Sequence, residues 1–175
     1  IGVDLFLFSG SYTDVATLGN VPKYTAGNLY YYPGFHPLRD GERFDYELSR
    51  CLTREIAFEA VARVRGTQGM RITNFYGNYL TRGKDLLALP SFSADSTFSL
   101  DFVHEQPVLN AGTICLQSAL LYTSSNGERR IRVNTIALPT TNVEKDVFES
   151  VKIDALCNVM MKASVDLSLK SGLGS

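Results

Sequence analysis

The sequence predicts a chain of mixed α and β structure: the end of an α/β domain, an antiparallel β-sandwich or barrel, and the start of a helical region. Residues 3–8 form a continuous apolar run, typical of a strand buried in a parallel sheet. Short stretches of alternating apolar and polar residues follow between residues 56 and 138. From Ile153 onward the apolar residues change to helical spacing. The expected domain boundaries are 1–37, 38–139 and 140–175.

The first part predicts a strand, two short helices and a second strand. Ser11 and Asp14 have the spacing of a capping box, which predicts a helix start at Ser11. Gly19 interrupts this helix, and Pro22 suits the first turn of the next one. A further strand is expected over 28–32. Such a unit needs more parallel strands beside it, so we expect the chain to be a fragment of a larger α/β protein.

The middle part begins with an amphipathic helix over 40–54, in which Phe44, Leu48 and Cys51 share one face. A period of two then predicts a strand over 56–65, with Phe58 on the same face as Ala60. Further strands are expected near 71–79, 97–103, 113–123 and 128–138. Asn126-Gly127 predicts a type I′ hairpin between the last two strands.

The segment 85–90 is short, apolar and closed by proline, and it predicts an edge strand. Its leucines either cap the β core or line a groove for an extended peptide, and the sequence leaves both alternatives open. Near the C-terminus, Thr141 and Glu144 predict a second capping box. A longer helix is expected from Ile153 to about Gly172.

The charge of the chain is balanced overall but uneven locally. With 17 basic and 18 acidic residues, the net charge of −1 gives no general attraction to nucleic acid or anionic lipid. Residues 43–84, however, carry eight basic and four acidic side chains, a net charge of +4. Arginines that share a strand face suit carboxylates or phosphates, and the alternative is a solvated face with internal ion pairs. The candidate basic residues are Arg63, Arg65, Arg130 and Arg132.

The usual signatures of catalysis and metal binding are absent from the sequence. His36 and His104 belong to no zinc-protease or nucleophile-elbow pattern, and no phosphate-binding loop is present. The three cysteines lie far apart without a C-x-x-C pair, so neither a zinc site nor a disulfide framework is predicted, and a reducing compartment is expected. The glycines of residues 66–69 resemble the clamp of an RNA-binding KH module, but a hairpin turn between two strands fits better.

Several stretches, in the same order along the chain, resemble the cargo-selecting subunit of the COPII inner coat. The stretches similar to the end of its trunk domain are Val3-Asp4-Leu5-Phe6-Leu7-Phe8, Asp14-Val15-Ala16-Thr17-Leu18-Gly19 and Tyr30-Tyr31-Tyr32-Pro33. Those similar to its β-sandwich are Cys51-Leu52-Thr53-Arg54, Ala62-Arg63-Val64-Arg65, Gly69-Met70-Arg71, Asn74-Phe75-Tyr76-Gly77, Leu120-Leu121-Tyr122-Thr123 and Arg129-Arg130-Ile131-Arg132. The resemblance covers almost the whole chain.

This resemblance implies a von Willebrand A-like trunk end, a β-sandwich and the start of an all-α helical domain. It implies a non-enzymatic, cytoplasmic coat protein, peripheral on endoplasmic-reticulum exit sites and COPII vesicles. The expected partners are the sister inner-coat subunit, a Sar-type small GTPase, the cytosolic tails of membrane cargo and the membrane surface. By position, Leu86 lies where the family has a hydrophobic residue beside a groove for acidic-hydrophobic signals. The family's structural zinc belongs to a zinc finger outside this segment, so no cofactor is expected here.

Three alternatives remain beside the coat adaptor. The sister, GTPase-activating subunit of the same coat shares the architecture. A nucleic-acid-binding β module would use the basic window together with aromatic residues such as Phe75 and Tyr76, although no nucleic-acid partner is expected. A hydrolase with its active site divided between this segment and a missing part is supported only by the incomplete α/β unit.

Overall fold

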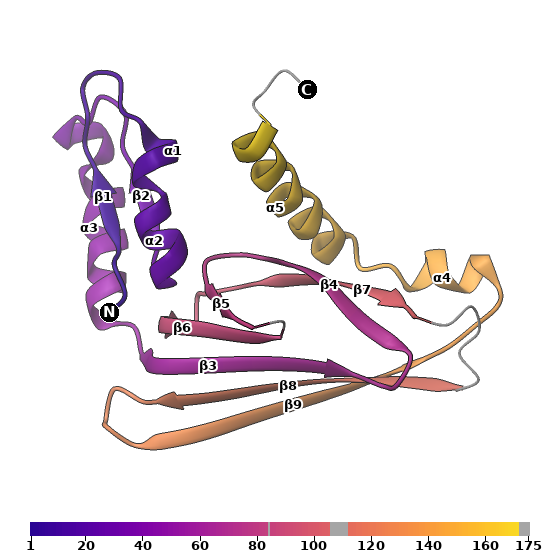
Figure 1. Ribbon diagram of the computed structural model, residues 1–175. Coiled ribbons are helices and arrows are strands. Elements are labelled where there is room, and N and C mark those ends of the chain that lie inside the picture. The colour runs from indigo at the N-terminus through magenta and orange to yellow at the C-terminus, as the bar shows by residue number, and fades with distance from the viewer. Residues whose placement is uncertain (84, 106–111, 172–175) are drawn as a thin grey trace. The chain divides into compact units, whose positions relative to one another are not determined.

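The computed structural model describes residues 1–83, 85–105 and 112–171 and confirms the mixed fold class (Figure 1). Its strands form three sheets: a parallel pair β1–β2, an antiparallel pair β4–β7, and a five-stranded sheet in the order β5-β6-β3-β8-β9. The helices are α1 (Val15–Leu18), α2 (Asn20–Thr25), α3 (Pro37–Thr53), α4 (Glu144–Ser150) and α5 (Ile153–Ser171). The strands are β1 (Leu5–Leu7), β2 (Leu29–Tyr31), β3 (Ile56–Gly66), β4 (Met70–Tyr76), β5 (Leu80–Arg82), β6 (Leu86–Ser93), β7 (Ser99–His104), β8 (Thr113–Thr123) and β9 (Arg129–Pro139).

The chain divides into two compact units, and each unit is built from three separate segments of the sequence. The first unit comprises residues 1–62, 78–96 and 120–131, and the second comprises residues 63–77, 97–119 and 132–175. The long strands β3, β8 and β9 each contribute to both units. Within the part of the chain that the structure describes, no helix is both long enough and apolar enough to cross a membrane.

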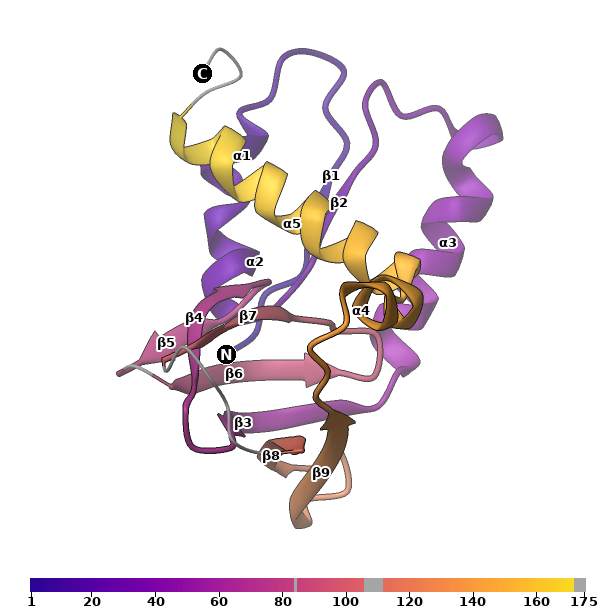
Figure 2. The same cartoon turned by 90° about the vertical axis from the view of Figure 1, so that its right-hand side faces the viewer.

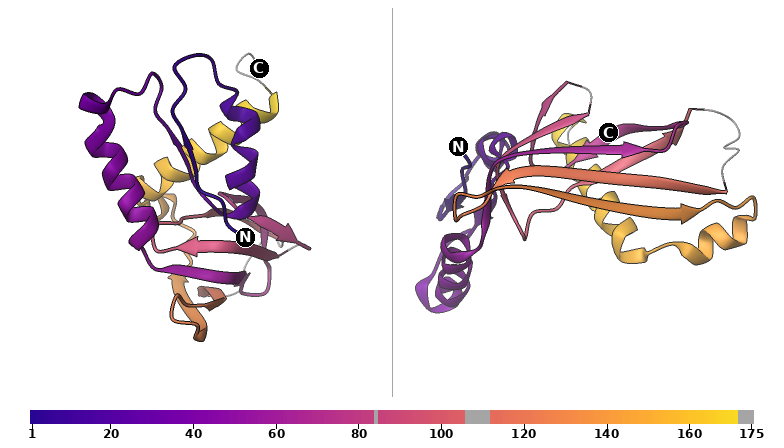
Figure 3. Two further views of the ribbon diagram at one scale, coloured as in Figure 1. Left: turned by 90° about the vertical axis from the view of Figure 1, so that its left-hand side faces the viewer. Right: turned by 90° about the horizontal axis from the view of Figure 1, so that it is seen from below.

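In the first unit, the parallel pair β1–β2 is packed by aromatic rings. Phe6 pairs with Tyr30 in register, and their rings stack with centroids 4.5 Å apart. Phe8 stacks on Tyr32 at 5.2 Å, and Phe44 of α3 meets the Phe8 ring edge-on at 5.0 Å. Figures 2 and 3 show α2 and α3 on opposite sides of the pair, as expected for parallel strands covered on both faces.

Helix α3 begins three residues before its predicted start because Pro37 occupies the first helical turn, where its missing N–H costs nothing. Asp40 in that turn accepts a hydrogen bond from the His36 backbone N–H at 2.9 Å. On the inner face, the Tyr32 hydroxyl donates to Glu47. Burial and this hydrogen bond raise the pKa of Tyr32 to about 12.

Both predicted capping boxes are wrong. Asp14, rather than Ser11, caps α1: its carboxylate accepts from the Thr17 backbone N–H at 3.1 Å and from the Thr17 hydroxyl at 2.5 Å. A carboxylate is a stronger acceptor than a hydroxyl, so the helix starts where Asp14 can cap it. Near the C-terminus, Thr141 accepts from the Val143 backbone N–H, and α4 starts at Glu144 without a side-chain cap.

Strand β3 changes its buried face at Glu59, which the strict alternation did not predict. Glu59 has φ +50°, a conformation uncommon for a residue with a side chain. Ala57 is buried before this point and Ala60 after it, whereas Phe58 is 44% exposed. An irregular residue that moves the pattern by one position is the property of a β-bulge. The predicted pairing of Phe58 with the Ala60 face is therefore wrong, and the alternation holds only from Ala60 onward.

The two turns that the sequence predicts are present, but neither has its expected geometry. At residues 66–69 the Met70 N–H donates to the Thr67 carbonyl at 3.0 Å, yet β4 pairs with β7 rather than with β3, so this turn connects two sheets and is not a hairpin. At the β8–β9 hairpin, Gly127 has φ +83°, whereas Asn126 has no positive φ. A type I′ turn needs both, so the five-residue connection 124–128 is a different turn, with a left-handed glycine at position 127.

Candidate functional site

Leu86, the predicted signal-contacting residue, lies at the start of β6 in the first unit. Strand β6 was expected at an edge of a sheet, and this prediction is wrong: β6 lies between β5 and β3. The true edge is β5, a strand of three residues that pairs antiparallel with β6. Strand β5 lies inside the region between two predicted strands, where its brevity leaves too few positions for a visible alternation.

The two faces of β6 differ sharply in burial. Leu87 and Leu89 are 0% and 1% exposed and belong to the core, whereas Leu86 on the opposite face is half-buried. Cross-strand partners share a face, and in this register Leu86 is opposite Arg82 and Ala88 is opposite Leu80. We call these four residues, Leu80, Arg82, Leu86 and Ala88, the β5–β6 face.

Arg82 is the residue of this face that sequence reasoning missed. Its side chain is exposed, and no ion pair is recorded for it within the described residues. Leu80 beside it is 41% exposed. A solvated guanidinium next to apolar side chains suits a ligand that carries a carboxylate close to an apolar group, because arginine matches carboxylate geometry and the leucines remove apolar surface from water. Only the register of β5 against β6 places Arg82 there.

The four predicted basic residues lie on two strands that are not neighbours. Arg63 and Arg65 are on β3, and Arg130 and Arg132 are on β9, with β8 between these strands. Arg63 is half-buried, and the other three are exposed. The structure therefore brings the arginines together as two pairs, each along one face of its own strand.

The four arginines differ in whether they form ion pairs with carboxylates of the same chain. Arg130 binds Glu128, and its guanidinium lies 3.7 Å from a carboxylate oxygen of Glu55. The hydrogen bond to Glu128 raises the pKa of Arg130. For Arg65 and Arg132 no ion pair is recorded within the described residues. Arg65 and Arg132 are thus the cations of this set best able to bind an external anion.

The basic window of residues 43–84 is largely neutralised within the fold. Four of its arginines form ion pairs with carboxylates: Arg43 with Glu47, Arg50 with Asp95, Arg54 with Asp4, and Arg71 with Glu105. Internal pairs of this kind reduce the positive potential that a phosphate backbone would meet. Over its described residues, 43–83, the window therefore does not form a continuous basic stripe.

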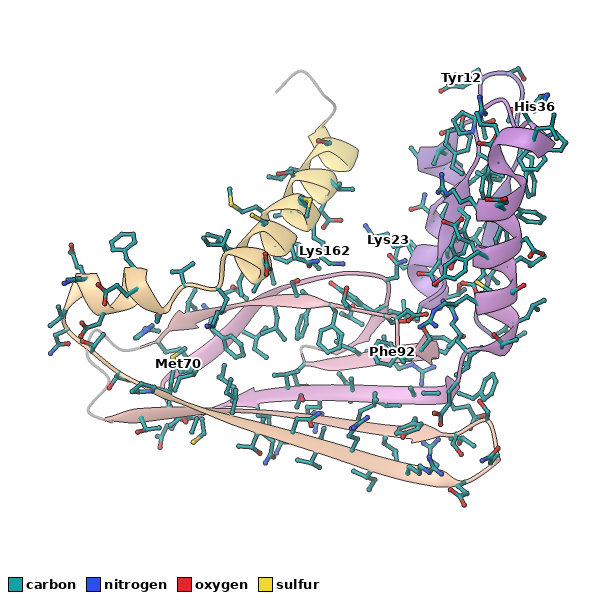
Figure 4. The ribbon with its side chains drawn as sticks, turned by 180° about the vertical axis from the view of Figure 1, so that it is seen from behind. Tyr12, Lys23, His36, Met70, Phe92 and Lys162 are labelled. Carbon is teal, nitrogen blue, oxygen red and sulfur yellow. The ribbon has the colours of Figure 1, made fainter. Side chains whose placement is uncertain are left out.

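Within the described residues, neither histidine belongs to a group of side chains that could hold a metal ion. His36 and His104 are both exposed, and Figure 4 shows His36 at the start of α3, at the far end of that helix from β3. Among residues 1–83, 85–105 and 112–171, no three His, Cys, Asp or Glu side chains are placed to hold a metal ion. The Cys51 thiol is buried and donates to the Tyr30 hydroxyl at 3.1 Å, and burial raises the thiol pKa.

The second unit contains a small pocket of about 190 Å³. Its apolar walls come from Val64, Leu100, Phe102, Leu116 and Ile136, and polar groups of β8 and β9 complete it. The walls include neither Leu86 nor any of the four predicted arginines. The pocket is therefore separate from the residues that the sequence indicated.

Comparison with known proteins relates the chain to one family along most of its length. The Sec23/Sec24 trunk domain matches residues 1–52, and the Sec23/Sec24 beta-sandwich domain matches residues 57–141. Protein transport protein sec24 of Aspergillus clavatus is 45% identical over 175 residues, which cover 99% of this chain and 19% of that protein. Protein transport protein Sec24A of Homo sapiens is 42% identical over 176 residues, which cover 99% of this chain and 16% of that protein.

A solved structure supports the same relationship. The crystal structure of the human COPII-coat protein Sec24c superposes with a TM-score of 0.89 at 36% identity and covers 98% of this chain and 23% of that one. The chain spans about a fifth of the length of the curated relatives that it matches. Because both domains match in order and the relatives carry the same name, the chain belongs to the Sec23/Sec24 family, as a trunk and β-sandwich segment of the Sec24 type.

Proposed function

We propose that this chain is part of a COPII cargo adaptor that binds cytosolic sorting signals of membrane proteins during transport from the endoplasmic reticulum to the Golgi. Its relatives are protein transport proteins and a COPII-coat protein, and this similarity supports the proposed class of function. The observation that supports a specific binding site is the composition of the β5–β6 face. There a half-buried leucine and a solvated arginine share one surface, which suits an acidic-hydrophobic peptide.

The mode of recognition follows from the exposure of the side chains on this face. A few exposed side chains bind a peptide weakly, on the order of micromolar or roughly −8 kcal/mol. Attachment to a membrane and assembly into a coat raise the effective concentration of both partners, so weak contacts add up to retention. The protein thus needs no catalytic group for this role, and we propose a non-enzymatic function.

The further partners follow the same proposal. They are the sister inner-coat subunit, a Sar-type small GTPase and the endoplasmic-reticulum surface, with the protein cytoplasmic and peripheral on exit sites and coated vesicles. Arg65 and Arg132, which have no recorded ion pair within the described residues, are the residues of this segment available for lipid phosphates. The family's zinc finger lies outside this segment, and no cofactor is proposed within it.

The test is titration of the full-length adaptor with an acidic-hydrophobic cargo-tail peptide. Leu86→Trp should weaken binding because a bulky ring fills the half-buried position, and Arg82→Glu should weaken it because it repels the peptide carboxylate. We expect a loss of about tenfold or more for each variant, the equivalent of one charged hydrogen bond or one buried apolar group.

Leu38→Trp is the matched control, since Leu38 is 94% exposed on α3 and lies outside the β5–β6 face. Its affinity should equal that of the unmodified protein. Unchanged binding in both the Leu86 and the Arg82 variants would remove the peptide site from this face. Loss in the control as well would indicate a general defect of the indole substitutions.

A further inference from the structure

Arg54 occupies the connection between the two family domains. The trunk match ends at residue 52 and the β-sandwich match begins at residue 57. Arg54 is the C-cap of α3, with an extended backbone (φ −64°, ψ 147°) and its N–H donated to the Arg50 carbonyl at 2.9 Å. Its side chain is only 7% exposed. The side chain of a linker residue is therefore buried, which is unusual because connecting segments commonly run over the surface.

The guanidinium of Arg54 lies between carboxylates from both domains. One terminal nitrogen donates to Asp4 Oδ2 at 2.8 Å, just before β1 of the trunk part. The other lies 3.9 Å from Asp95 Oδ2, just after β6 of the sandwich part. All three residues belong to the first compact unit. One cation thus contacts both domains from the short segment that joins them.

Each carboxylate is itself held in place. Asp4 Oδ1 accepts from the Asn28 backbone N–H at 2.7 Å and from its side-chain amide at 3.2 Å. The Asp95 carboxylate accepts two hydrogen bonds from the Arg50 guanidinium, at 2.9 and 2.5 Å, and this bidentate interaction lowers the pKa of the Asp95 carboxyl. Because neither carboxylate is free to turn, the position of Arg54 fixes their separation.

Close backbone contacts accompany this network. A Cβ added to Gly2 would lie 2.0 Å from Cβ of Ser91, so the trunk backbone approaches β6 directly. Asn78, between β4 and β5, donates to the Gly27 carbonyl at 2.7 Å. The trunk end and the β5–β6 half of the sandwich therefore meet along several contacts. We call the four charged residues at this junction, Asp4, Arg50, Arg54 and Asp95, the Arg54 joint.

Burying the charged Arg54 side chain costs free energy, so the joint is a poor choice if its only role is to stabilise the fold. Arg54 Nε is buried and has no hydrogen-bond partner within the described residues. Buried charges lose their hydration, and apolar residues of similar volume often stabilise a fold as well or better. A paired charge, unlike apolar packing, satisfies its bonds in only one relative position of the groups that it joins.

We infer that Arg54 is a positioning residue that fixes the trunk end against the β5–β6 half of the sandwich, with Asp4 and Asp95 as its two anchors. The inference does not depend on which ligand the β5–β6 face binds. It implies that residues 53–56 act as a hinge when Arg54 loses its charge, although each domain keeps its own core.

Hydrogen exchange of the full-length protein tests this, with Arg54→Met, Arg54→Lys and the control Arg71→Met. Arg71 forms an exposed pair with Glu105, at 59% and 51% exposure, and such pairs contribute little. In Arg54→Met, amide exchange over residues 53–56 and over β6 should rise by roughly 10²-fold, since Asp4 loses its charged partner and Asp95 keeps only Arg50, so no cation joins the two carboxylates. Residues of β4 and β7 should keep their protection.

Rescue distinguishes positioning from general support of the fold. Arg54→Lys keeps the charge and should restore most of the protection, and Asp95→Asn should give a smaller rise confined to the same segments. Equal exchange in Arg54→Met and the unmodified protein would overturn the inference. A uniform rise in amide exchange across the chain in Arg54→Met, repeated in Arg54→Lys, would also overturn it. Arg54 would then support the stability of the whole fold and would not position the two parts. Peptide affinity measured on the same variants keeps this outcome separate from failure of the proposed function.

Discussion

Arg54 and Arg82 belong to the same compact unit, and their environments are opposite. Arg54 is buried between two carboxylates that are themselves hydrogen-bonded, whereas Arg82 is exposed beside apolar side chains with no ion pair recorded within the described residues. A charge whose partners are all internal can hold parts of a fold together, and a charge without internal partners remains available for an external one. Arginine count alone therefore does not predict a binding surface in this protein.

The largest expected effect contrasts the two faces of β6. Leu87→Ala should destabilise the protein by about 2–5 kcal/mol, because Leu87 is fully buried and its truncation leaves a cavity. Leu86→Ala should cost clearly less, since its side chain is only half-buried. Chemical denaturation of the full-length variants measures both values. Equal losses would contradict the assignment of the β5–β6 face as the accessible side.

A smaller effect is expected at the close backbone approach in the trunk part. A Cβ added to Gly27 would lie 1.9 Å from the Val3 carbonyl oxygen, so Gly27→Ala forces the backbone to shift and should cost roughly 1–3 kcal/mol. Gly41→Ala is the matched control, because nothing lies within 4 Å of its added Cβ in the middle of α3. That control should stabilise the protein by about 0.5–1 kcal/mol. Thermal unfolding checks both, and a stable Gly27 variant would show that the backbone there yields.

The smallest effect concerns the acid dependence of the Arg54 joint. The bond from Arg50 lowers the pKa of Asp95 in the folded protein, so its contribution to stability is present above the unfolded pKa of about 4 and is lost as the pH falls through the lower, folded pKa. In Asp95→Asn the free energy of unfolding should fall less steeply with decreasing pH in this acid range. Near neutral pH the slope of the free energy of unfolding against pH should stay nearly the same. Unfolding curves between pH 2 and 6 measure it, and an unaltered slope would exclude Asp95 as a titrating anchor.

Sequence reasoning recovers elements whose pattern repeats and misses those defined by a single residue or a short pairing. The amphipathic α3 and the long strands β8 and β9 were predicted because apolar residues recur over many positions. The face of β3 was predicted wrongly before Ala60, since the unusual φ of Glu59 has no sequence pattern. The position of β6 within the sheet was missed because its neighbour β5 has three residues.

The candidate site divides in the same way. Leu86 came from a resemblance to known coat proteins, and its half-buried place was not visible in the local sequence. Arg82 required the register between β5 and β6, and the Arg54 joint required contacts with residues 50 and 41 positions away along the chain, at Asp4 and Asp95. Long-range pairs of this kind depend on tertiary structure, which propensity and periodicity do not encode.

The edge position of β5 has a consequence for colloidal behaviour. An edge strand exposes unpaired backbone groups, and proteins commonly prevent self-association there with short strands and charged side chains. Strand β5 has both protections, with three residues and Arg82 at its end. The guanidinium that is proposed to bind a peptide carboxylate would thus also keep two copies of the protein from pairing edge to edge. A neutral apolar residue at this position would lower solubility and favour aggregation.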